Sequence, residues 1–186
     1  RILPGLRNPF TPQTTDRSQP AVLKALEDLS EYRAASGHYQ VIIDLEKDVR
    51  YVPSFIKGER TLFVAAGTVD AHVDFGRLGP DAVSVNENRT AVTIRLPHAV
   101  LSGARVEPAR SYVYDRERGL VDRIGGAFGS DPGGTSEREL YLLAEKKLVD
   151  AAGDGDVTGR AEENTTSMLT SLMRSLGFTT VDVTFG

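Results

Sequence analysis

The sequence has no cysteine among its 186 residues. This absence excludes disulfide bonds, thiol catalysis and thiolate metal sites, although it leaves the cellular compartment open. Long apolar runs are absent as well, because every apolar stretch is far shorter than the roughly 18 residues that a transmembrane helix needs. The chain begins at Arg1 without a methionine, so the sequence gives no view of an anchor or signal peptide upstream.

A strong excess of positive charge is also missing. The formal net charge is −4, whereas a general nucleic-acid-binding protein shows a basic face, so we expect no nucleic-acid partner. The hydrophobic share of 40% and the charged share of 26% are those of an ordinary globular protein. A chain of this length suffices for one domain with a substantial core.

The first 17 residues differ in character from the rest. They contain three prolines and show no hydrophobic period, which is typical of an extended tether. Ser18 and Pro20 then resemble the start of a helix. We therefore predict a tether over residues 1–17 and a single domain over residues 18–186.

Hydrophobic periodicity predicts the elements of that domain. Helical spacing indicates a helix over residues 20–33 and two C-terminal helices, one starting at the Ser136/Glu139 capping box and one after Asp156. Period-two alternation predicts strands over residues 39–45, 61–75, 83–85, 92–96 and 181–185. The segregation of strands and helices predicts an α+β fold, with helices packed on a largely antiparallel or mixed sheet to which the final strand returns.

Two further features are expected inside this pattern. The apolar positions of residues 61–75 change parity near Gly67, which suggests a β-bulge or bend there. Residues 119–128 place four apolar side chains on one helical face, which favours a short amphipathic helix.

Six segments of the chain carry a resemblance to a known family. They are residues 28–37 (DLSEYRAASG), 46–55 (EKDVRYVPSF), 58–64 (GERTLFV), 119–125 (GLVDRIG), 161–165 (AEENT) and 176–178 (LGF). These segments resemble the bacterial family catalogued as domain of unknown function 4230, and its actinobacterial branch in particular. The resemblance covers nearly everything from Asp16 onward. It implies an N-terminal membrane anchor, absent from this chain, and implies no activity, cofactor or catalytic residue.

One set of residues has the chemistry of a metal site. Asp70, His72 and Asp74 alternate along a predicted strand and therefore project from one face. Carboxylate and imidazole groups suit Zn²⁺ or Mn²⁺, but successive ligands lie about 7 Å apart along a strand, so a further ligand is required. A solvated polar face is the simpler interpretation, and we assign no cofactor.

A possible binding surface combines aromatic and basic side chains. Exposed aromatic groups near a sheet edge suggest docking, and arginines ahead of the glycine-rich loop suit anionic groups, although interleaved carboxylates weaken their field. Core packing and ordinary surface pairing are the simpler alternatives. The candidate residues are Tyr51, Phe55, Arg60, Arg116 and Arg118.

No complete catalytic set appears in the sequence, so catalysis is not expected. The leading hypothesis is an extracytoplasmic binding or scaffolding domain of a membrane-anchored cell-envelope protein, with an envelope protein or a small ligand as partner. A second hypothesis is a small-ligand sensor with a pocket between the sheet and the C-terminal helices. A third is a metal-dependent hydrolase that uses Asp70, His72 and Asp74.

Overall fold

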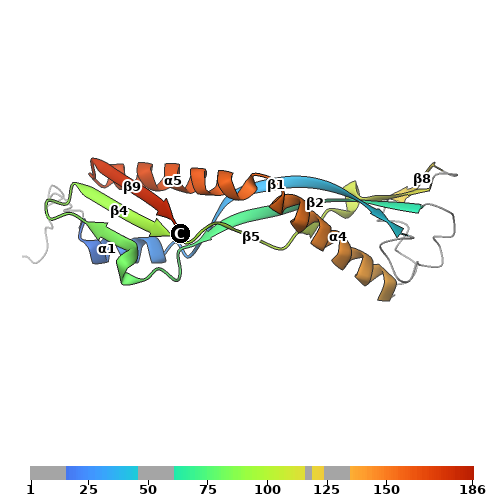
Figure 1. Cartoon of the computed structure of the whole chain (residues 1–186), viewed down its shortest axis with the longest axis horizontal. Helices are drawn as coiled ribbons and strands as arrows, with labels where there is room; N and C mark the ends of the chain where they lie inside the picture. The colour runs from blue at the N-terminus through green and yellow to red at the C-terminus, as the bar shows by residue number, and fades with distance from the viewer. Residues whose placement is uncertain (1–15, 46–60, 116–118, 124–134) are drawn as a thin grey trace, which may run out of the picture.

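The computed structural model describes residues 16–45, 61–115, 119–123 and 135–186. The molecule is elongated, and a long strand pair, β1 (Glu31–Asp44) and β2 (Thr61–Asp74), extends through much of its length (Figure 1). Each of these strands has 14 residues, which corresponds to about 46 Å at ~3.3 Å per residue. The other elements pack around this pair.

The larger sheet, sheet A, is built on β2. Its main path runs β1-β2-β7-β8, and all its pairings are antiparallel. On the side of β2 away from β1, three short strands follow one another along its length, with serine side chains between them. The three short strands are β5 (Val100–Leu101), β6 (Arg105–Val106) and β7 (Tyr112–Asp115). The last strand of the path is β8 (Gly119–Arg123).

The smaller sheet, sheet B, contains β3 (Val83–Val85), β4 (Ala91–Leu96) and β9 (Thr180–Phe185). Strands β3 and β4 form the predicted hairpin, whose turn is closed by Asn86 Oδ1 accepting from the backbone N–H groups of Thr90 and Ala91. The final strand pairs parallel to β4. The predicted α+β class is confirmed, with the strands divided between two sheets.

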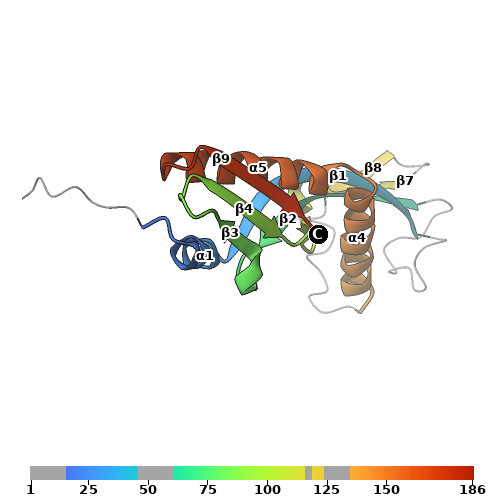
Figure 2. The ribbon, with the colours of Figure 1, turned by 60° about the vertical axis from the view of Figure 1, so that its left-hand side comes forward.

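Two long helices cover one face of the β1–β2 pair. They are α4 (Thr135–Gly153) and α5 (Val157–Ser175), and they point in different directions (Figure 2). Helix α1 (Gln19–Glu27) packs against β3 at the other end of the molecule. The helix terminus predicted at Gly177 is confirmed by its φ of +100°, a left-handed conformation that glycine adopts readily. Among the described residues, no helix has the length and apolar character to cross a membrane.

The apolar interior forms two clusters. The larger joins α1, α5, the inner face of sheet B and the C-terminal half of β2; its members include Leu26, Val73, Phe75, Ile94 and Leu169. The smaller lies under the N-terminal half of α4 and is built on seven buried residues: Ile43, Leu45, Phe63, Ala65, Val113, Leu140 and Ala144. Both clusters use the same face of β2, because Phe63, Val69 and Val73 share one parity along the strand.

Three sequence-based expectations need correction. The first helix ends at Glu27 instead of continuing to residue 33, because Glu31–Arg33 extend β1 and pair with β2. Residues 119–123 form β8, which pairs with β7, so the expected helix is wrong there. The rest of that expected helix, residues 124–128, lies outside the described part of the chain.

The expected bulge at Gly67 is also misplaced. Pairing with β1 is continuous through Gly67, and the register shift falls in β1 between Arg33 and Ala35. Residue 67 is glycine for a different reason: an added Cβ would lie 2.6 Å from Leu148 Cδ1 and 2.7 Å from the carbonyl oxygen of Arg105. The close approach of α4 and β6 therefore leaves no room for a side chain.

Candidate functional site

The face of β1–β2 opposite the helices is polar along the middle of the molecule. We define the polar face as Glu31, Arg33, Ser36, Thr68, Asp70, His72 and Asp74, together with Arg105 and Glu107 from the adjacent segment. Cross-strand pairing places Ser36 beside Asp70, Arg33 beside His72, and Glu31 beside Asp74. The predicted projection of Asp70, His72 and Asp74 from one face of a strand agrees with this register.

Asp70 is at the centre of the polar face and is only 6% exposed. Its Oδ1 accepts a 2.5 Å hydrogen bond from the Ser36 hydroxyl. Its Oδ2 lies 3.1 Å from Arg33 Nε and 3.1 Å from Arg105 Nη2. A carboxylate removed from water needs such partners, so this pairing accounts for its burial.

The backbone of Asp70 is held by a serine side chain. Between β5 and β6 the neighbouring chain leaves the regular ladder, and Ser102 Oγ accepts a 3.2 Å hydrogen bond from the Asp70 N–H. The Ser102 N–H donates to the Asp70 carbonyl at 2.9 Å. Asp70 is therefore fixed at both its backbone and its carboxylate.

His72 has a different partner. Its Nε2 lies 3.2 Å from Glu31 Oε1, and β5 places Val100 opposite it on the other side. The Nδ1 atom is buried and has no hydrogen-bond partner among the described residues. The neighbouring strands thus surround the ring, with one nitrogen directed to the Glu31 carboxylate.

Asp74 has partners of its own. Its Oδ1 accepts from the N–H of Gly76 at 2.8 Å, and its Oδ2 lies 3.7 Å from Arg77 Nε. Asp70, His72 and Asp74 therefore point toward three separate sets of partners. Within the described ranges, no group of three or more histidine, aspartate or glutamate residues could hold a metal ion.

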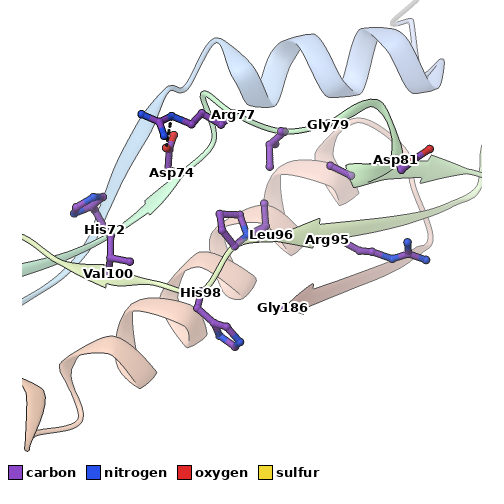
Figure 3. Close-up of a pocket in the computed structure, with 13 residues that line it drawn as sticks. His72, Asp74, Arg77, Gly79, Asp81, Arg95, Leu96, His98, Val100 and Gly186 are labelled. Carbon is purple, nitrogen blue, oxygen red and sulfur yellow. Dashed lines mark ion pairs between the residues drawn. The ribbon is translucent and has the colours of Figure 1, made fainter.

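An open groove of about 550 Å³ lies at the end of β2. One wall is the end of β2 and the segment that follows it, and the other wall is the link between β4 and β5 (Figure 3). Figure 3 shows Asp74 joined to Arg77 on the first wall and His98 on the second. Leu78, Leu96 and Val100 contribute apolar surface, while the charged groups of Asp81 and Arg95 stand at the rim.

The second wall of the groove is attached to α5. Glu162 Oε1 lies 3.0 Å from His98 Nδ1 and accepts a 3.1 Å hydrogen bond from the N–H of Ala99. A single carboxylate on α5 therefore positions the β4–β5 link. The groove thus depends on the packing of α5 as well as on the sheets.

One group beside the Asp70 cluster has a shifted pKa. The Thr68 hydroxyl donates a 2.7 Å hydrogen bond to Glu107 Oε1, which lowers the pKa of Glu107 below its usual value. A hydrogen bond from Arg110 acts in the same direction. Glu107 is therefore held in its charged form at the edge of the polar face.

The residues of the predicted binding surface lie outside the described part of the chain. They are Tyr51, Phe55, Arg60, Arg116 and Arg118. The groove described above lies between the end of β2 and the β4–β5 link, and the pocket expected between the sheet and the C-terminal helices stays a prediction.

Sequence reasoning missed Arg33, because residues 31–33 were assigned to the first helix. The alternation of charged and less polar residues over Glu31-Tyr32-Arg33-Ala34 is a sequence signal that would have indicated a strand. Nothing in the sequence joins Arg33 to Arg105, since their strands meet only through β2.

Comparison with known proteins gives a family and no activity. No curated protein and no solved structure matches the chain. Residues 24–183 match the family described as "Protein of unknown function (DUF4230)". That match includes nearly all of the described strands and helices, and the chain belongs to this family.

Proposed function

We propose that this chain is a non-catalytic binding domain on the extracytoplasmic side of a membrane-anchored cell-envelope protein. The observation that carries the binding role is the open groove, whose volume of about 550 Å³ is within the range of small-molecule sites. Its apolar lining would supply binding energy, and the charged groups at its rim would orient a partner. The anchor and the location rest on the family resemblance.

The polar face also supports binding over catalysis. Asp70, His72 and Glu107 are already engaged by Ser36, Glu31 and Thr68. A general acid or base must be within hydrogen-bond reach of a substrate proton. Groups fixed in this way are better suited to positioning their neighbours than to transferring protons.

The location can be tested with a single added cysteine, because the chain has none. Ser171→Cys places a thiol on the exposed side of α5, in the full-length protein in its native host. We expect a membrane-impermeant maleimide to label intact cells, and the protein to stay in the membrane fraction until detergent is added. The parent protein without the added cysteine is the control. Labelling that requires cell lysis would overturn the extracytoplasmic location.

The groove favours a second candidate function, that of a small-ligand sensor. A ligand that binds the folded state raises the melting temperature, so a thermal-shift screen would find candidates. Val100→Trp would narrow the groove from β5, where Val100 is 50% exposed. Leu142→Trp is the matched control, because Leu142 is 55% exposed on α4, away from the groove.

A ligand of the groove should lose its thermal shift in Val100→Trp and keep it in Leu142→Trp. A ligand that shifts all three proteins equally would bind elsewhere. In that case the groove would lose its support as the site of sensing.

A further inference from the structure

Two arginines on the polar face share a single carboxylate oxygen. Arg33 Nε and Arg105 Nη2 both lie 3.1 Å from Asp70 Oδ2, and they reach it from β1 and β6 on opposite sides of β2. Both arginine side chains are 63% exposed, whereas the Asp70 side chain is 8% exposed. The carboxylate therefore lies beneath two guanidinium groups that face solvent.

The hydrogen-bonding capacity of this cluster is unequally used. A guanidinium has five N–H donors; Arg105 uses one in a 3.1 Å hydrogen bond to Asp70 Oδ2, and Arg33 Nε forms an ion pair with the same oxygen. The carboxylate accepts hydrogen bonds from Arg105 and Ser36 and forms an ion pair with Arg33, so both of its oxygens are engaged. Most of the guanidinium donors thus remain free of partners within the described residues.

The charges of the cluster do not cancel. Two guanidinium groups against one carboxylate leave one positive charge on a chain whose formal net charge is −4. The nearest carboxylates on the same face are engaged elsewhere, Glu31 with His72 and Glu107 with Thr68 and Arg110. The cluster of Arg33, Asp70 and Arg105 therefore has one guanidinium more than it has carboxylates.

We propose that Arg33 and Arg105 form a binding site for a phosphate-type oxyanion, with Asp70 as the buried group that orients both guanidiniums. Planar guanidinium groups match the oxygens of a phosphate through paired hydrogen bonds. Because Asp70 and Ser36 already fix the geometry, less side-chain freedom is lost when an anion binds. This inference does not depend on the groove or on the proposed cellular location.

The first experiment uses inorganic phosphate as the probe. Binding is measured by isothermal titration calorimetry at constant ionic strength, with chloride as the balancing anion. Arg33→Gln and Arg105→Gln each leave the other arginine on Asp70, so the fold is retained. Either change should weaken phosphate binding roughly tenfold, because one charge-assisted pair is lost.

The matched control is Arg110→Gln. Arg110 has a 62% exposed side chain and an ion pair of its own with Glu107, so the change in net charge and exposure is the same. Phosphate affinity of this variant should stay within twofold of the parent. Arg33→Lys keeps the charge but loses the planar donor pair, and it should behave like Arg33→Gln if geometry determines binding.

A second arm identifies the source of the phosphate. The protein is sedimented with vesicles of phosphatidylglycerol and, separately, of phosphatidylcholine. Retention on phosphatidylglycerol alone, lost in Arg33→Gln and kept in Arg110→Gln, would assign the site to a lipid headgroup. Binding of inorganic phosphate without vesicle retention would assign it to a soluble phosphate compound.

Two results would overturn the proposal. One is the absence of saturable binding to both inorganic phosphate and phosphatidylglycerol in the parent protein. The other is an equal loss of binding in Arg110→Gln and Arg33→Gln, which would reduce the effect to general surface charge.

Discussion

At the scale of the residue, the segments that pack against β2 explain why position 67 is glycine. Leu148 of α4 and Arg105 of β6 both pack against Gly67, and each has an atom within 2.7 Å of an added Cβ. One of these neighbours is the backbone carbonyl of Arg105, which cannot move without disturbing the β2–β6 pairing. The residue is thus required for packing and not for a turn.

Gly67→Ala should destabilise the protein by about 1–3 kcal/mol, the usual cost of overpacking a well-filled core. Urea unfolding followed by circular dichroism measures this change. Gly79→Ala is the control, because no atom lies within 4 Å of its added Cβ, and it should stay within about 0.5 kcal/mol of the parent. Equal effects of the two substitutions would contradict the packing argument.

Glu107 provides a test at the same scale that uses pH. Its folded pKa is lowered chiefly by the Thr68 hydroxyl, so its stabilising contribution is present above the unfolded pKa and is lost as the pH falls through the folded pKa. Thr68→Val should raise the pKa of Glu107 toward the ordinary value and reduce the loss of stability in acid. A carbon-detected NMR titration of the Glu107 carboxyl group measures the change directly.

Arg110→Gln should also raise the pKa of Glu107, because it removes a hydrogen bond and a positive charge that both lower this pKa. An unchanged pKa in Thr68→Val would show that the hydroxyl is not the source of the shift.

At the scale of the element, serine side chains complete the backbone hydrogen bonding along one edge of β2. The edge of β2 that faces away from β1 pairs with three short strands, β5, β6 and β7, instead of one long strand. Ser102 lies in the break between β5 and β6, and Ser111 lies in the break between β6 and β7. Ser111 is fully buried; its Oγ accepts a 3.0 Å hydrogen bond from the Ala66 N–H and donates to the Glu107 carbonyl at 2.8 Å. These side chains satisfy backbone groups that a continuous strand would otherwise pair.

Ser111→Ala should destabilise the protein by about 1–3 kcal/mol, since a buried backbone N–H loses its partner. The free energy of unfolding in urea gives the value. Ser84→Ala on the exposed side of β3 is the control and should be nearly neutral. A neutral Ser111→Ala would indicate that the break between β6 and β7 closes without the hydroxyl.

A β-bulge in β1 shapes the Asp70 cluster. Strict alternation would place Arg33 and Ser36 on opposite faces, since they are three residues apart. The extra residue at Ala34 shifts the register and brings both side chains to Asp70. The Ala34 carbonyl accepts a 2.8 Å hydrogen bond from Asn164 Nδ2 on α5. A helix on the other face of the sheet therefore supplies a hydrogen-bond donor to the backbone at the bulge.

At the scale of the whole molecule, two apolar clusters are joined through β1 and β2. The smaller cluster contains Phe63, and the larger contains Leu169. Because continuous strands run through both clusters, we expect them to unfold together as the single domain predicted for residues 18–186.

Phe63→Ala should cost about 3–5 kcal/mol and Leu169→Ala about 2–5 kcal/mol, each by leaving a cavity. Both should lower the midpoint of one shared unfolding transition, followed in parallel by circular dichroism and tyrosine fluorescence. Two separate transitions, each sensitive to one substitution, would instead show that the clusters are independent units.

Much of the architecture could be predicted because local pattern specifies it. The hairpin of β3 and β4, helices α4 and α5, the glycine stop at Gly177 and the final strand all follow from periodicity and capping residues within a short window. Residues 31–33 and 119–123 were assigned to helices because their sequence suits both states. Pairing with β2 and with β7 decided between these states.

The sequence by itself determined which faces are apolar, and therefore the α+β class and the order of its elements. Only the tertiary structure decided the bulge at Ala34, the meeting of Arg33 and Arg105 on Asp70, and the groove between β2 and the β4–β5 link. The physical reason is range: periodicity acts between neighbours along the chain, whereas these contacts join segments tens of residues apart.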